Sequence, residues 1–199
     1  MQLNLIKKPE NEIISLAEAK NYLRIDHDFD DTLIVGTIKS TREALESIIQ
    51  KSIFKQTWEY VLDNYSICNF DFCESDYPSI FCDIIKIPLP KPPIMKIISV
   101  KVGEKEQKEC KYSVEKINHK FCLCINYGKS LHRRNKVSIK IIYEAGIADK
   151  VENIPYQLKL ANLMLMANAY QERFSYKQEG VISQGIKQLL SPFLNLRIF

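Results

Sequence analysis

Residues 14–50 read ISLAEAKNYLRIDHDFDDTLIVGTIKSTREALESIIQ, and residues 143–174 read YEAGIADKVENIPYQLKLANLMLMANAYQERF. The first stretch repeats apolar residues near the 3.6-residue period of a helix, and the second contains a run that is apolar almost all round. Between them lies a block with the patterns of β-structure. The order predicts an α+β fold, a helical bundle formed by N- and C-terminal helices with an inserted antiparallel β subdomain. We assign residues 1–54 to the N-terminal helices, 55–146 to the inserted β subdomain and 147–199 to the C-terminal helices and tail.

The N-terminal segment carries clear helix signals. Ser15 and Glu18 form a capping box, which predicts a short helix to about Arg24. A second helix is expected from about Asp30 to about Gln50, and within it Arg42 and Glu46 have the spacing of an ion pair.

Four aspartates, Asp26, Asp28, Asp30 and Asp31, cluster between these two helices. A calcium-binding loop of the helix–loop–helix type requires a glycine and a final glutamate at fixed offsets, and both are absent. We therefore interpret the aspartates as a loop followed by carboxylates at a helix N-terminus, where the helix dipole favours negative charge.

The middle block predicts several strands, because it alternates apolar and polar residues and is rich in β-branched and aromatic ones. The segments are residues 55–62, 84–89, 97–102, 111–115, 121–125 and 136–143. The prolines at positions 88, 90, 92 and 93 exclude a helix and predict an extended connector before the third of these strands. Residues 63–83 predict a long loop or irregular strands, and residues 126–135 a loop.

The C-terminal segment predicts a helix from Pro155 to about Arg173, buried on most sides because its apolar residues surround it. A last short helix is expected to end near Leu190, before Pro192. The apolar tail, residues 193–199, is expected to dock either onto the core of the chain itself or onto a partner.

Composition and cysteine spacing exclude several classes of protein. No segment has the pattern of a secretion signal or the length of a membrane span, so we expect a cytosolic protein without a membrane partner. The six cysteines lie between residues 68 and 124 and lack the paired spacing of a zinc site, which favours reduced thiols over zinc or disulfides. There is no phosphate-binding glycine loop and no nucleophile or metalloprotease motif. We expect neither catalytic activity nor a cofactor.

Charge is distributed unevenly along the chain. Residues 1–85 carry a net −7, residues 86–140 a net +10 and residues 141–199 a net +1. The basic block is consistent with three interpretations: lysines that keep strands solvated, contact with the acidic part of another subunit, or contact with nucleic acid.

The order of these segments resembles the head–tail connector family of tailed bacteriophages, also called adaptor or head-completion proteins, with relatives in prophages and gene transfer agents. The similarity rests on LAEAKNYLRID, HDFDD, KQTWEYVLD, IPLPKPPIMKIISVKV, VSIKIIYEAGI, IPYQLKLANLMLMANAYQER and LLSPF, in that order. It covers about residues 13–193, and the order of the motifs carries it rather than any single one.

The resemblance implies a structural subunit that forms a ring of about twelve copies under the portal of a DNA-filled capsid. Such a ring extends the DNA channel and supports the stopper or tail-completion protein. It would be assembled in the host bacterial cytoplasm and reside in the neck of the mature virion or virion-like particle. The alternatives are a monomeric nucleic-acid-binding module that uses residues 86–140, and a different neck or tail-completion protein.

Two sets of residues are candidates for contacts in such a ring. Basic residues for DNA-channel or inter-subunit contacts are Lys101, Lys105, Lys108, Lys129, Arg133, Arg134 and Lys136. Apolar and basic residues of a portal-docking tail are Phe193, Leu194, Leu196, Arg197, Ile198 and Phe199.

Overall fold

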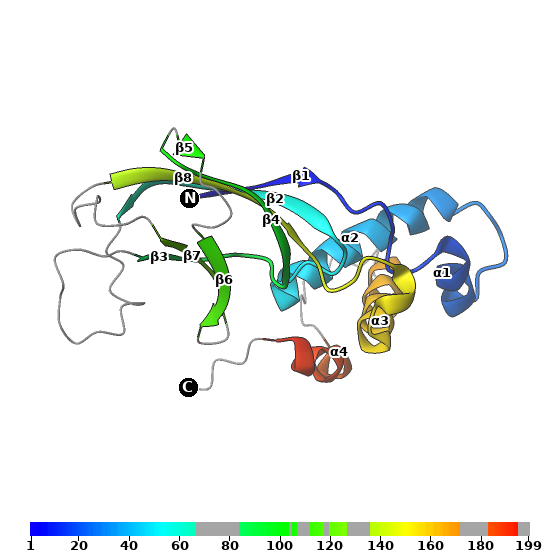
Figure 1. The fold of residues 1–199 in the computed structure, drawn as a ribbon. Coiled ribbons are helices and arrows are strands. Elements are labelled where there is room, and N and C mark those ends of the chain that lie inside the picture. Colours follow the sequence, from blue (N-terminus) through cyan, green and yellow to red (C-terminus); the bar gives the residue numbers. More distant parts are fainter. Residues whose placement is uncertain are drawn as a thin grey trace. The chain divides into compact units, whose positions relative to one another are not determined.

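The computed structural model describes residues 1–66, 84–103, 105–106, 112–117, 120–126, 136–171 and 183–194. Within these ranges the chain combines helices with antiparallel sheets, which confirms the predicted α+β class (Figure 1). The chain divides into two compact units. The β unit contains residues 1–8 and 55–146, and the helical unit contains residues 9–54 and 147–199.

A five-stranded sheet forms one layer of the β unit. Its strands, in spatial order, are β1 (Gln2–Lys7), β2 (Gln56–Ser66), β8 (Lys136–Ala145), β4 (Ile94–Val102) and β5 (Lys105–Glu106). In β8 the buried Ile139, Ile141 and Tyr143 alternate with more exposed residues, because successive side chains of a strand point to opposite faces. This confirms the strand predicted over 136–143.

A three-stranded sheet forms the second layer of the β unit. Its order is β3 (Ile84–Pro88), β7 (Lys120–Asn126) and β6 (Tyr112–Ile117), all antiparallel. The two sheets share one hydrophobic core, in which Ile87 and Leu123 of the smaller sheet join residues such as Val100 and Ile141 of the larger. The strands predicted over 84–89, 111–115 and 121–125 are therefore present, with ends shifted by one or two residues.

Two features of the β unit differ from the sequence-based expectation. Strand β1 was not predicted; residues 2–7 pair antiparallel with β2 rather than joining the helices. The proline-rich connector bends at residues 90–92, with Lys91 at a positive φ of 57°, and is not extended. The bend has a physical reason, since the chain must turn there from β3 in the smaller sheet to β4 in the larger.

The helical unit gathers residues from both ends of the chain around one core. Its elements are α1 (Leu16–Leu23), α2 (Asp31–Ile49), η3 (Val151–Asn153), α3 (Tyr156–Gln171), α4 (Gln184–Leu190) and η5 (Ser191–Phe193). The core includes Ile34 and Leu45 of α2, Leu158 of α3 and Ile186 of α4. The helices predicted after Ser15, Asp30 and Pro155 and before Pro192 are all present.

The start of α1 has the predicted capping box. The Glu18 backbone N–H donates to Ser15 Oγ at 3.2 Å, and the Ser15 backbone N–H donates to Glu18 Oε2 at 2.7 Å. Asp30 is the N-cap residue of α2, as predicted, but its side chain makes no capping bond. Its carboxylate instead accepts a hydrogen bond from the Tyr170 hydroxyl of α3, so it joins two helices.

Helix α3 is covered on most sides along its middle, as predicted. Leu158, Ala161, Asn162 and Met166 are buried, and Leu160, Leu163, Met164 and Leu165 are partly buried. Its exposed residues lie at the two ends of the helix.

Candidate interaction surfaces

The outer face of the five-stranded sheet, which points away from the core shared by the two sheets, carries a group of lysines. Lys96 and Lys101 lie on β4, and Lys136 and Lys140 lie on β8. All four are exposed, because they alternate with the buried residues of their strands. Lys101 is the direct cross-strand partner of Lys140, so two cations stand side by side. We refer to these four residues as the lysine face.

Carboxylates neutralise only part of the positive charge of the sheet. Lys140 pairs with Glu59 of β2, and Lys55 pairs with Glu144 of β8 at 3.0 Å. The hydrogen bond from Lys140 lowers the pKa of Glu59 from its ordinary value, and a second one from the Asn4 side chain acts in the same direction. Within the described part of the chain, Lys96, Lys101 and Lys136 have no ion-pair partner.

The structure describes three of the seven basic candidates. Lys101 and Lys136 lie on the lysine face, and Lys105 lies on β5, which pairs with the end of β4. Lys108, Lys129, Arg133 and Arg134 fall outside the described residues. Sequence reasoning missed Lys96 and Lys140, although the alternation along residues 136–143 already assigned Lys140 to the same face as Lys136.

The apolar tail is described only at its start. Phe193 and Leu194 are half-buried and pack against the core of the helical unit. Leu196, Arg197, Ile198 and Phe199 fall outside the described residues. The role of the tail in docking to a portal stays a prediction.

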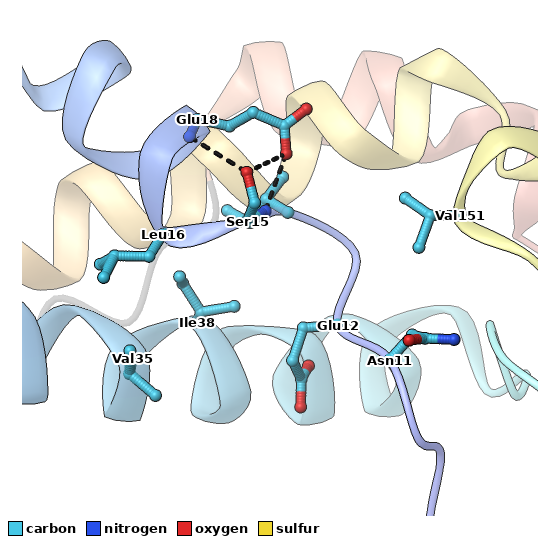
Figure 2. Close-up of a pocket in the computed structure, with 9 residues that line it drawn as sticks. Asn11, Glu12, Ser15, Leu16, Glu18, Val35, Ile38 and Val151 are labelled. Atoms are coloured by element: carbon cyan, nitrogen blue, oxygen red, sulfur yellow. Dashed lines mark hydrogen bonds between the residues drawn. The ribbon is translucent and has the colours of Figure 1, made fainter.

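The helical unit contains a groove of about 360 Å³ between the segment before α1, the start of α1, α2 and η3. Figure 2 shows Leu16 of α1 and Ile38 of α2 facing each other in it, with Val151 on the far side. The apolar lining is completed by Ile14 and Val35. The polar lining residues are Asn11, Glu12, Ser15 and Glu18, so the groove is apolar with an acidic margin.

Both glutamates of the groove have polar partners within the helical unit. Glu18 is held by the capping box, and these hydrogen bonds, the backbone one first, lower its pKa. Glu12 accepts from Arg42 Nε at 2.8 Å. The same guanidinium contacts Glu46, in the predicted ion pair at 3.1 Å, and Glu43 at 3.4 Å. One arginine therefore serves three carboxylates.

Chemistry at the described cysteines is disfavoured. Cys122 and Cys124 of β7 are free and buried, and burial raises the pKa of both thiols, to about 11 for Cys124. A thiol with a raised pKa is a poor nucleophile and a poor metal ligand. The described residues contain no group of side chains suited to hold a metal ion. None of the described helices is both long enough and apolar enough to cross a bilayer.

Comparisons with known proteins place this geometry in context. Residues 13–80 match the family model described as "Phage gp6-like head-tail connector protein". No curated protein matches the chain.

Solved structures with the same fold include chains of gene transfer agent (GTA) particles. In "Neck of empty GTA particle computed with C6 symmetry" the similar chain is 17% identical with a TM-score of 0.71. In "Neck of native GTA particle computed with C12 symmetry" the identity is 14% and the TM-score 0.71. Each match covers 100% of this chain and 98% of the other. The family match and the shared fold confirm the resemblance to head–tail connectors.

Proposed function

We propose that this protein is a structural head–tail connector, or adaptor, subunit in the neck of a phage-type particle. One combination of observations carries the proposal: residues 13–80 match a connector family, and the fold of the whole chain is that of chains in particle necks. The role proposed is mechanical and requires no catalysis, metal or cofactor. It makes use of the predicted arrangement, a helical bundle built from both chain ends with a β subdomain inserted between them.

The proposed working form is a ring beneath the portal. The necks that contain the similar chains were reconstructed with sixfold and twelvefold symmetry, which supports a ring of about twelve subunits here. The proposed neighbours are the portal protein on one side and a stopper or tail-completion protein on the other. Assembly in the host cytoplasm would precede incorporation into the neck of the particle.

The lysine face supports a further part of this proposal, which is that the ring extends a DNA channel. Lys136 of β8 is exposed and carries no ion pair within the described chain. Cations placed near passing DNA interact with phosphates without reading the sequence. Repetition around a ring multiplies the charge that each subunit contributes.

Negative-stain imaging tests the proposal directly. The purified protein is imaged alone and after mixing with the portal protein encoded with it. We expect rings, either free or bound to the portal. A monomer that ignores the portal would contradict the connector role.

Two variants test the finer contacts. Charge reversal of Arg133 and Arg134 is expected to reduce retention of packaged DNA without preventing assembly, and unchanged retention would remove these residues from the channel. Deletion of residues 194–199 is expected to weaken portal binding. Undiminished portal binding would contradict a portal-docking role and favour docking of the tail onto the core of its own chain.

A second candidate function is a monomeric nucleic-acid-binding module, which Lys96, Lys101 and Lys136 favour because they are exposed and form no ion pair with the described residues. It predicts salt-dependent binding to duplex DNA by a protein that stays monomeric. The imaging experiment separates it from the connector. A different position in the neck, as another completion protein, is distinguished by which partner the ring binds.

A further inference from the structure

Strand β4 contains two irregularities that expose large apolar side chains. Its register with β8 shifts by one residue between Ile94 and Lys96 and again between Ile97 and Ser99. The extra residues are Met95 and Ile98, so each belongs to a β-bulge, which redirects side chains at a sheet edge. Met95 is 43% exposed and Ile98 is 48% exposed.

The same stretch of β4 is an open edge. Strand β5 pairs only with Lys101 and Val102, so among the described strands residues 94–100 have β8 as their single neighbour. An open edge with exposed apolar residues invites association unless it is covered. Lys96 lies between the two bulged residues and Lys101 follows them, and neither has an ion-pair partner within the described chain. We call residues 94–101 the β4 edge.

The groove of the helical unit has the complementary character. Leu16 and Val35 offer apolar contact over the buried Ile38, Glu12 and Glu18 stand at the margin, and none of the lining residues is basic. Val35 is itself 37% exposed. Arg42 contacts Glu12 but is shared with Glu43 and Glu46, and Lys159 lies close enough to Glu18 to act on its charge without forming an ion pair in the described residues.

We propose that the β4 edge of one copy docks into the groove of the helical unit of a second copy. Met95 and Ile98 would contact Leu16 and Val35, while Lys96 and Lys101 would face Glu12 and Glu18. Because the donor and acceptor surfaces differ, the contact is heterologous, and repetition of it closes a ring when the rotation per copy permits. The inference rests on the proposed connector function and specifies the subunit contact of its ring.

Charge and polarity favour a second copy over DNA as the occupant. Phosphates would satisfy the two lysines but would leave Met95 and Ile98 against water. An apolar groove with acidic margins satisfies the two lysines and also covers the two apolar side chains. Opposite charges steer the association, and burial of apolar surface stabilises the complex. Each copy carries an acidic segment, residues 1–85 with a net −7, and a basic segment, residues 86–140 with a net +10. Each copy can therefore supply the acidic side of one contact and the basic side of the next.

A charge-swap series in the full-length protein tests this contact. Lys96→Glu places a carboxylate on the β4 edge, and Val35→Lys places a cation in the groove. Sedimentation velocity at a series of concentrations measures self-association of each variant. We expect either change alone to weaken association at least about tenfold through like-charge contact, and the two combined in one chain to recover most of it.

Two matched control variants make the same charge changes at positions outside the proposed contact. Lys136→Glu reverses an exposed lysine on β8, and Leu33→Lys adds a cation at an exposed position of α2 that does not line the groove. We expect both to associate like the wild type. Circular dichroism of each variant establishes that it is folded.

Each remaining outcome overturns the proposal in a recognisable way. Wild-type association that none of the variants changes would assign the ring contact to other surfaces and leave the connector function standing. Unchanged association with weaker binding of Lys96→Glu to random-sequence duplex DNA would assign the β4 edge to nucleic acid. A wild type that stays monomeric at every concentration would exclude the contact as a stable interface, while imaging with the portal judges the connector function separately.

Discussion

The two compact units handle their charged residues in opposite ways. In the helical unit, Arg42 and Glu46 are almost fully buried and are held by partners within the chain. In the β unit, Lys96, Lys101 and Lys136 are exposed and lack ion pairs within the described residues. The difference indicates that the buried pair of Arg42 and Glu46 maintains the fold, whereas Lys96, Lys101 and Lys136 are available to molecules outside the chain.

The strongest test of this comparison removes the buried cation. Arg42→Ala leaves Glu46 buried and unpaired and deprives Glu12 of its partner, so we expect the helical unit to lose about 3–5 kcal/mol of unfolding free energy. Urea titration followed by the helical circular dichroism signal measures it. Lys39→Ala, at an exposed position of the same helix, is the control and is expected to change little. Equal effects of the two changes would refute the structural role of Arg42.

The β unit allows a matched test of a buried polar group. The Tyr143 hydroxyl donates to the Pro90 carbonyl at 2.8 Å, and burial raises the pKa of this phenol. Tyr143→Phe should lower the stability of the β unit by about 1 kcal/mol, since one hydrogen bond is lost. Trp58, the single tryptophan of the chain, lies on β2 beside this core and reports the loss by fluorescence. Tyr156→Phe, which alters an exposed phenol, should leave the fluorescence transition unchanged.

The capping box makes part of the stability of the helical unit depend on pH. Hydrogen bonds from Ser15 lower the pKa of Glu18 below its ordinary value of 4.5. The stabilisation is therefore present in full above that value and is lost as the pH falls through the lowered pKa. Glu18→Gln should be less stable than the wild type near neutral pH, and the difference should vanish in acid. Urea titrations across this range measure it.

A shorter carboxylate separates two causes of the Glu18 effect. Glu18→Asp keeps the negative charge near the helix N-terminus but shortens the reach to the Ser15 backbone. If it matched the wild type at every pH, the helix dipole rather than the capping box would account for the stabilisation.

Local signals in the sequence predicted the regular elements well. The capping box of Ser15 and Glu18 gave the start of α1, and alternation along residues 136–143 gave the strand. These signals depend on neighbours within a few positions, where propensity and periodicity act. The same reasoning identified the pair of Arg42 with Glu46, four residues apart.

Features set by long-range pairing were not predictable in this way. Strand β1 is short, and its assignment depends on its pairing with β2, about fifty residues later. The bulges at Met95 and Ile98 exist only relative to the register of β8.

The smallest predicted effect concerns the lysine face itself. Lys101 and Lys140 are direct cross-strand partners, and like charges in that position destabilise a sheet. Lys101→Ala should therefore stabilise the β unit by about 0.2–0.5 kcal/mol at low ionic strength. The gain should shrink as added salt screens the repulsion. Trp58 fluorescence in urea titrations measures the change in stability.

Lys116→Ala is the control for this effect. Lys116 lies on β6 opposite Phe121 of β7, so it has no cationic cross-strand partner, and its removal should give no such gain. A stability gain at Lys101 alone would show that this residue opposes folding of the isolated chain, as expected of a charge whose partner lies on another molecule. A loss would instead give Lys101 a role in the fold and weaken the contrast between the two units.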